Sequence, residues 1–80
     1  MKSIQGYKGY VIEARSFEVK HGGFSAEFSV EEHDANGVTE RQFYLTETFQ
    51  SKQLAIVAAT EAGRRKIDLG LEPGRAVVNG

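Results

Sequence analysis

The first half of the chain alternates apolar and polar residues with a period of two, which predicts antiparallel strands. In FSAEFSVE, residues 24–31, every second residue is apolar and the others are serine or glutamate. In GYVIEA (residues 9–14), Tyr10, Ile12 and Ala14 share one face. VTERQFYL (residues 38–45) follows as the next strand, and Phe43 and Leu45 continue the inner face. Side chains alternate between the two faces of a strand, so each run predicts a strand with one buried face and one face in water.

Glycine-containing turns separate these runs. The Gly-Gly at 22–23 and the Asn-Gly at 36–37 are turn signals, and Asn-Gly favours a hairpin because both residues tolerate positive φ. The N-terminal residues up to Tyr7 predict a further short strand before a Lys-Gly turn at 8–9. The segment RSFEVKHGG (15–23) fits either an extension of the preceding strand past a bulge or a short strand of its own.

The period changes at Ser51, and the chain from there predicts a helix over about residues 51–69. The Ser51 hydroxyl is a good N-cap because it can accept a hydrogen bond from a free backbone N–H of the first turn, and Gly70 is a good stop. At about 100° per residue, small and apolar side chains form one broad stripe. Its members are Ala55, Ile56, Ala59, Gly63 and Ile67, widened on one side by Leu54, Ala58 and Ala62.

These elements predict an α+β fold, in which one helix packs on an antiparallel sheet of three to five strands over about residues 3–46. Gly63 inside the helix predicts a close approach of the helix backbone to the sheet, because glycine is otherwise unfavourable there. Residues 1–70 are expected to form a single domain and residues 71–80 a flexible tail. The Ala-Val-Val at 76–78 offers the alternative of an added edge strand.

Composition excludes several classes of protein. The 80 residues include no cysteine, so no disulfide or thiolate metal site is possible. The formal net charge of −1 is far less basic than that of a protein which binds nucleic acid through its overall field. MKSIQGYKGY lacks the apolar core of a signal peptide, and no run approaches the roughly 18–20 apolar residues of a membrane span. The expected location is cytoplasmic.

No residue pattern indicates catalysis, a metal or a cofactor. His21 and His33 fall near opposite ends of one predicted strand, roughly 40 Å apart, too far to share an ion. The acidic run around His33, residues 31–34, is typical of a solvated hairpin tip. No nucleophile elbow and no glycine-rich phosphate motif is present. We therefore expect a non-enzymatic protein without cofactors.

Two surfaces are candidates for binding. Three residues interrupt the polar outer face of the predicted sheet: Val11, Val38 and Tyr44. They are either scattered surface residues or a contact patch for a partner protein or a second copy.

The second candidate is the basic run near the end of the helix: Arg64, Arg65 and Lys66. Cations there complement the negative end of the helix dipole, and Glu61 is placed to pair with Arg65. The alternative is a grip for nucleic acid, although helix phase turns each cation about 100° from the one before it.

Several short motifs resemble those of a group of small bacterial proteins of uncharacterised activity, some encoded among prophage and phage-tail genes. The motifs are an opening G-Y-V-I strand, an aromatic residue after Gly-Gly, a T-F-x-S lead into the helix (residues 48–51) and A-G-R-x-x-I-D at its end (residues 62–68). The resemblance covers roughly residues 5–70. It implies a strand-rich part followed by one helix and a phage-associated context, and it assigns no site residue. A runner-up analogy is a small antitoxin-like domain, which usually has a strand after the helix.

The expected function is protein–protein interaction or assembly, with self-association as one form of it. The alternative is a weak nucleic-acid-binding accessory protein that uses the basic end of the helix.

Overall fold

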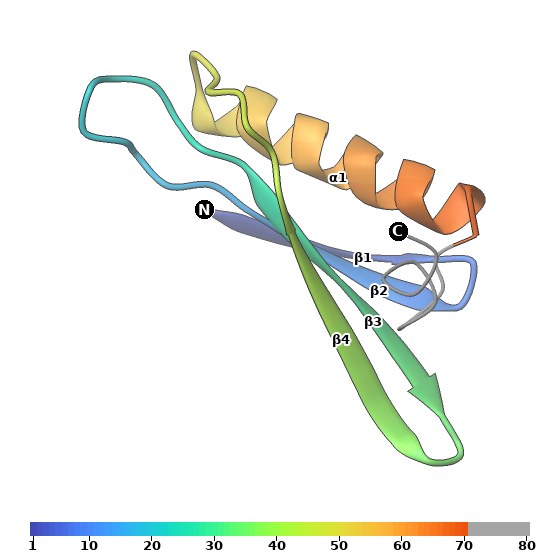
Figure 1. Ribbon diagram of the computed structural model, residues 1–80. Coiled ribbons are helices and arrows are strands. Elements are labelled where there is room, and N and C mark those ends of the chain that lie inside the picture. The colour runs from blue at the N-terminus through green and yellow to red at the C-terminus, as the bar shows by residue number, and fades with distance from the viewer. Residues whose placement is uncertain (71–80) are drawn as a thin grey trace.

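A computed structural model describes residues 1–70, and it confirms the predicted α+β class (Figure 1). Four antiparallel strands follow one another in the order β1-β2-β3-β4, and one helix comes after them. The elements are β1 (Lys2–Tyr7), β2 (Tyr10–Arg15), β3 (Glu27–Asp34), β4 (Gly37–Tyr44) and α1 (Lys52–Asp68). The predicted tail, with its alternative strand at 76–78, lies outside the described residues.

The two tight hairpins use different turns. Between β1 and β2, Lys8 (φ 50°) and Gly9 (φ 86°) both take positive φ, as a type I′ hairpin turn requires. Between β3 and β4 the loop is Ala35–Asn36, one residue earlier than the sequence predicted, and of the predicted Asn-Gly pair only Gly37 takes positive φ. The Asp34 carboxylate accepts a hydrogen bond from the Asn36 N–H and so stabilises this turn without a left-handed asparagine.

The link between β2 and β3, residues 16–26, corrects two expectations. Neither alternative for residues 15–23 forms: β2 ends at Arg15, and around residues 17–19 a single bridge joins Glu18 to Phe24. The strand predicted from residue 24 begins at Glu27, because the Phe24 backbone exchanges two hydrogen bonds with Phe49 just before α1. These two hydrogen bonds therefore hold the link next to the start of α1.

α1 begins and ends where the sequence predicted. The Ser51 hydroxyl accepts from the Leu54 N–H at 3.1 Å, and Gly70 takes φ 84° after the last turn. The helix packs mainly on β2, and also on β3 and β1. Figure 1 shows the β3–β4 hairpin twisting away from it. The buried core joins the two layers and consists of Ile12, Ala14, Ala26, Phe28, Val30, Ala55, Ile56, Ala59 and Ile67.

Replacing Ser51 with alanine should lower the free energy of unfolding by about 1 kcal/mol, because the Leu54 N–H loses its acceptor. Urea denaturation of Ser51→Ala and Ser51→Asp measures the effect. Aspartate also caps helices, so Ser51→Asp should keep most of the wild-type stability. If both variants are equally destabilised, capping is not the role of Ser51.

The helix stripe is narrower than the sequence predicted. Ala55, Ala59 and Gly63 are buried as expected, but Leu54 is 53% exposed. Ala58 and Ala62 on the same flank are half-buried, because α1 lies over β1–β3 and this flank faces β4, which the helix meets only through side chains such as Lys66.

Candidate functional site

A groove lies between α1 and β4, with a volume of about 340 Å³. It exists because α1 covers the other three strands and leaves the inner face of β4 open, while the sheet twists away from the helix. We call it the α1–β4 groove. Its lining residues are Phe28, Phe43, Tyr44, Leu45, Ala62, Arg65, Lys66 and Leu69.

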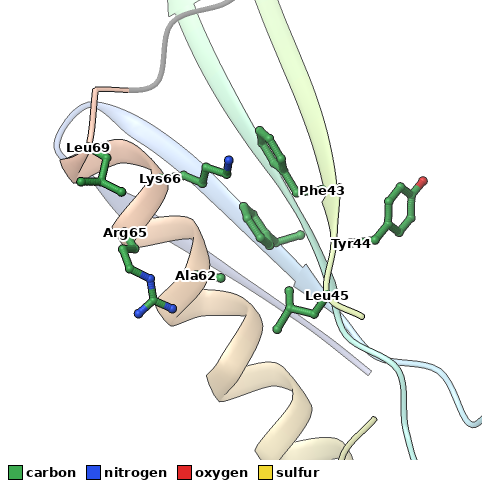
Figure 2. Close-up of a pocket in the computed structure, with 8 residues that line it drawn as sticks. Phe43, Tyr44, Leu45, Ala62, Arg65, Lys66 and Leu69 are labelled. Atoms are coloured by element: carbon green, nitrogen blue, oxygen red, sulfur yellow. The ribbon is translucent and has the colours of Figure 1, made fainter. Parts of the chain in front are cut away.

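Two stacked phenylalanines form the apolar floor of the groove. The rings of Phe28 and Phe43 lie 5.0 Å apart at an interplanar angle of 22°. Figure 2 shows Phe43 and Leu45 on the strand side facing α1, while Tyr44 points away from the helix. Leu69, on the helix side, is 79% exposed. The groove thus offers apolar surface to an incoming side chain.

The charged groups of the groove are all cations. Lys66 reaches from α1 toward β4 and places its Nζ 4.9 Å from the centre of the Phe43 ring (Figure 2). Arg65 is also a lining residue, and none of the lining residues is acidic. Arg41 lies two residues before Phe43 on the same face of β4, and its Nε is buried without a hydrogen-bond partner among the described residues.

The backbone of β4 adds a second feature to this side of the molecule. Within residues 1–70, β4 pairs with β3 along one edge and with no strand along the other. Such an edge presents unpaired N–H and C=O groups in a regular row. Main-chain hydrogen bonds and an apolar groove are therefore available side by side.

The sequence-predicted partner surface is dispersed over the face opposite α1. Val11, Val38 and Tyr44 all lie on that outer face, as the alternation predicted. Val38 and Tyr44 are six residues apart on β4, which separates them by roughly 20 Å. Glu31 and Glu40 occupy the row that begins with Val11. The three residues are not brought together within one chain.

Ion pairs cover much of the same outer face. Arg15 donates to Glu27 at 2.8 Å and to Glu13 at 2.9 Å, and these hydrogen bonds raise the pKa of its guanidinium. Ser29 was expected on a wet face but is 3% exposed, because longer side chains, Glu13 and Gln42, stand opposite it on both neighbouring strands.

The predicted basic patch is divided around the helix. Arg64 turns toward β1, where it donates to Gln5 at 2.6 Å and lies 5.8 Å from the centre of the Tyr7 ring. It also pairs with Glu61 at 3.1 Å, the partner that the sequence assigned to Arg65. Lys66 turns the other way, toward Phe43. Arg65 and Lys66 join the α1–β4 groove, and Arg64 does not.

The end of α1 is attached to the β1–β2 turn through one carboxylate. Asp68 accepts hydrogen bonds from Lys8 Nζ at 2.6 Å and from Tyr7 Oη at 2.9 and 3.0 Å. The Lys8 and Tyr7 hydrogen bonds hold the pKa of Asp68 below its ordinary 3.8, and Asp68 raises the pKa of Lys8. The attachment holds α1 toward β1 and so helps to keep the groove open.

Replacing Asp68 with asparagine should lower Tm at neutral pH by less than Ser51→Ala does, since the carboxylate is exposed. A lowered folded-state pKa stabilises the fold above pH 3.8 and ceases to do so as pH falls through the folded value. The Tm difference between wild type and Asp68→Asn should therefore shrink below about pH 4. Glu47→Gln, an exposed control, should show no such pH-dependent difference. A Tm difference that stays constant between pH 7 and pH 3 would contradict this prediction.

Metal-ligating groups do not converge in the described part of the chain. Residues 1–70 contain no group of three His, Asp or Glu side chains placed to hold an ion. His33 pairs with Glu31 at 2.9 Å on the outer face of β3. His21 lies in the link between β2 and β3 rather than on a strand, so the strand-length argument for its separation from His33 was wrong.

The fold and the groove define a small α+β protein with a four-stranded antiparallel meander, one covering helix and an open edge. Comparison of the chain with known protein families, curated proteins and solved structures finds no match. In the described part of the chain, no helix has the length and apolar character needed to cross a membrane.

Sequence reasoning missed the groove and Arg41. It assigned Phe43 and Leu45 to the inner face, but it placed the widened flank of the helix against the sheet. The sequence did contain one sign of the groove: Arg41 takes an inner-face position in VTERQFYL, where an apolar residue is expected.

Proposed function

We propose that this chain is a non-enzymatic protein-binding component that takes up an extended segment of a partner protein along β4. One observation carries the proposal: α1 lies beside β4 rather than over it, so that a groove along the inner face of β4 and its outer edge stay open within residues 1–70. Strand addition uses such an edge, with main-chain hydrogen bonds for affinity and pockets for alternate side chains for specificity.

The α1–β4 groove supplies the pocket that this binding mode needs. Apolar side chains of the added strand would contact Phe43, Leu45, the half-buried Ala62 of α1 and the exposed Leu69. A small domain buries a modest core, so a partner strand would also extend its apolar contacts. The proposal therefore accounts for the exposure of Leu69 and for the gap between helix and strand.

The biological setting belongs to the proposal as well. The resemblance of the sequence to phage-associated proteins favours a role in the assembly of such particles, and the absence of cysteine agrees with a cytoplasmic setting. Nucleic-acid binding is the alternative expected from the sequence. The divergence of Arg64 and Lys66 gives it less support than the groove gives to a protein partner.

Affinity capture with a blocked groove tests the function. Tagged wild type, Ala62→Arg and Val57→Arg are used to capture proteins from lysate of cells that naturally produce the chain. Ala62 lines the groove, whereas Val57 is 58% exposed and lies on the other flank of α1, against β1. We expect a protein that wild type and Val57→Arg retain and that Ala62→Arg loses, while all three have similar Tm values.

Two results would count against this function. Identical sets of captured proteins for wild type and Ala62→Arg would remove the groove as the docking site. Capture of nucleic acid alone, lost on raising the salt concentration and on changing Arg64 and Arg65 to alanine, would support the alternative.

A further inference from the structure

We infer that the segment bound along β4 is acidic: it carries a carboxylate that pairs with Arg41 and an apolar side chain two residues away that enters the α1–β4 groove. This inference rests on the proposed function and specifies the chemistry of the partner. Three observations support it: the charge of the groove, the unpaired Arg41 and the spacing along β4.

The charged residues that line the groove are all positive. Arg65 and Lys66 lie among its lining residues and Arg41 lies beside it on β4, with no acidic lining residue. None of these three cations forms a salt bridge within residues 1–70, whereas Arg15, Arg64 and Lys8 all do. Complementary charge steers binding and selects the partner, so this surface favours a segment with negative charge.

Arg41 specifies which chemical group the partner should carry. Its Nε is buried and has no hydrogen-bond partner among the described residues. Buried donors in proteins are nearly always paired, and an unpaired one requires an explanation. A carboxylate is the acceptor that matches a guanidinium, because its two oxygens can take two parallel N–H groups. A bound carboxylate would give the Arg41 guanidinium an acceptor that residues 1–70 do not provide.

The spacing along β4 sets the pattern of the partner. Arg41 and Phe43 share the inner face of β4 two residues apart, and Leu45 continues the series. In a strand paired beside β4, side chains opposite these residues point to the same face and also recur every two residues. The partner would therefore present an acidic residue opposite Arg41, an apolar residue opposite Phe43 and a second one opposite Leu45.

A second copy of β4 does not fit this pattern. In an antiparallel pair of β4 strands, opposite residues share a face, so Arg41 would meet an inner-face residue of the other copy. The inner-face residues of β4 include Thr39, Arg41 and Phe43, and none of them is acidic. Pairing centred on Arg41 would set two guanidinium groups against each other, which is unfavourable. A different, acidic chain is the better occupant.

Designed peptides test the inference against the full chain. The probe is a capped seven-residue threonine peptide with glutamate at its second position, valine at its fourth and leucine at its sixth, made in both sequence directions. The matched control has glutamine in place of glutamate. Titration into isotope-labelled protein, followed by NMR, gives both Kd and the amides that shift. We expect shifts in Gly37–Tyr44 and in residues 62–69.

Comparing the two peptides on wild type and on an Arg41 variant isolates the contribution of the peptide carboxylate. For wild type, the glutamate peptide should bind about tenfold more tightly than the glutamine peptide, as expected for a charge-assisted hydrogen bond. Arg41→Gln should abolish this difference. Lys52→Gln, which removes the same charge from the exposed start of α1, should preserve it.

Each other outcome overturns the inference. Equal affinity of wild type for the two peptides, no binding up to millimolar concentration, or shifts away from β4 would do so. A dimer of the chain alone whose shifted amides lie in β4 would identify a second copy as the occupant. In the capture experiment, loss of the partner in Ala62→Arg with full retention in Arg41→Gln would leave the proposed function standing and reject only the acidic segment.

Discussion

Replacing Ile12 with alanine should lower the free energy of unfolding by about 2–5 kcal/mol, the usual range for removing a large aliphatic side chain from a core. Ile12 is 0% exposed and lies on β2, the strand on which α1 mainly packs. Its side chain also fills the space directly above Gly63 of the helix. The variant therefore loses apolar burial and leaves a cavity between the two layers.

Urea denaturation followed by circular dichroism measures this loss. Ile4→Ala is the matched control, because it makes the same chemical change on the outer face of β1, where Ile4 is 61% exposed. The control should cost less than about 1 kcal/mol, as most surface substitutions do. If the two variants lose the same free energy of unfolding, the packing of α1 on β2 does not dominate stability.

Replacing Gly63 with valine should destabilise the chain by about 1–3 kcal/mol, as overpacked cores do. A Cβ at Gly63 would lie 2.8 Å from Ile12 Cγ2, and two more Ile12 atoms lie within 3.4 Å of it. The Ile12 methyl is attached directly to its Cβ and is fully buried, so it cannot move aside easily. The helix would have to shift away from β2.

The smaller variant Gly63→Ala tests this explanation through a change of sign. In wild type, the close contact should outweigh the gain in helix propensity, which is about 1 kcal/mol. In the Ile12→Ala background the contacting atoms are gone, so the same substitution should stabilise the chain by up to about 1 kcal/mol. Gln53→Val, at an exposed helix position, controls for the effect of valine on the helix itself. If Gly63→Ala destabilises both backgrounds equally, the contact with Ile12 is not the cause.

The two periods in the sequence were sufficient to predict the elements of the fold. Alternation placed Ile12 and Val30 on the inner face and Tyr44 on the outer face, and the helical stripe identified Ala59 and Gly63 as buried. These predictions depend on side-chain direction, which the local period determines. Boundaries were less accurate: β3 begins at Glu27 because Phe24 pairs with Phe49, a contact between distant parts of the chain.

The candidate site depends on the position of α1 across the sheet, which no local pattern encodes. Helix phase indicated which side chains face the sheet but not which strands they meet. The contact of Gly63 with Ile12 and the attachment of Asp68 to Lys8 hold α1 toward β1 and β2. Because the sheet twists, β4 is then left uncovered. Arg41 was visible in the sequence as a cation at an inner-face position, and its meaning depends on this uncovered strand.

The open edge of β4 also bears on whether molecules of this protein can join edge to edge. Within residues 1–70 the sheet has two unpaired borders, β1 and β4, and joining the β4 of one molecule to the β1 of the next would generate an endless filament rather than a closed assembly. An inward-pointing charge is one of the devices by which natural sheets prevent such growth. Arg41 occupies the position of that device on β4, and the strand Lys2–Tyr7 contains no acidic residue that could neutralise it. The same guanidinium that would select an acidic partner would thus discourage fibre formation while that partner is absent.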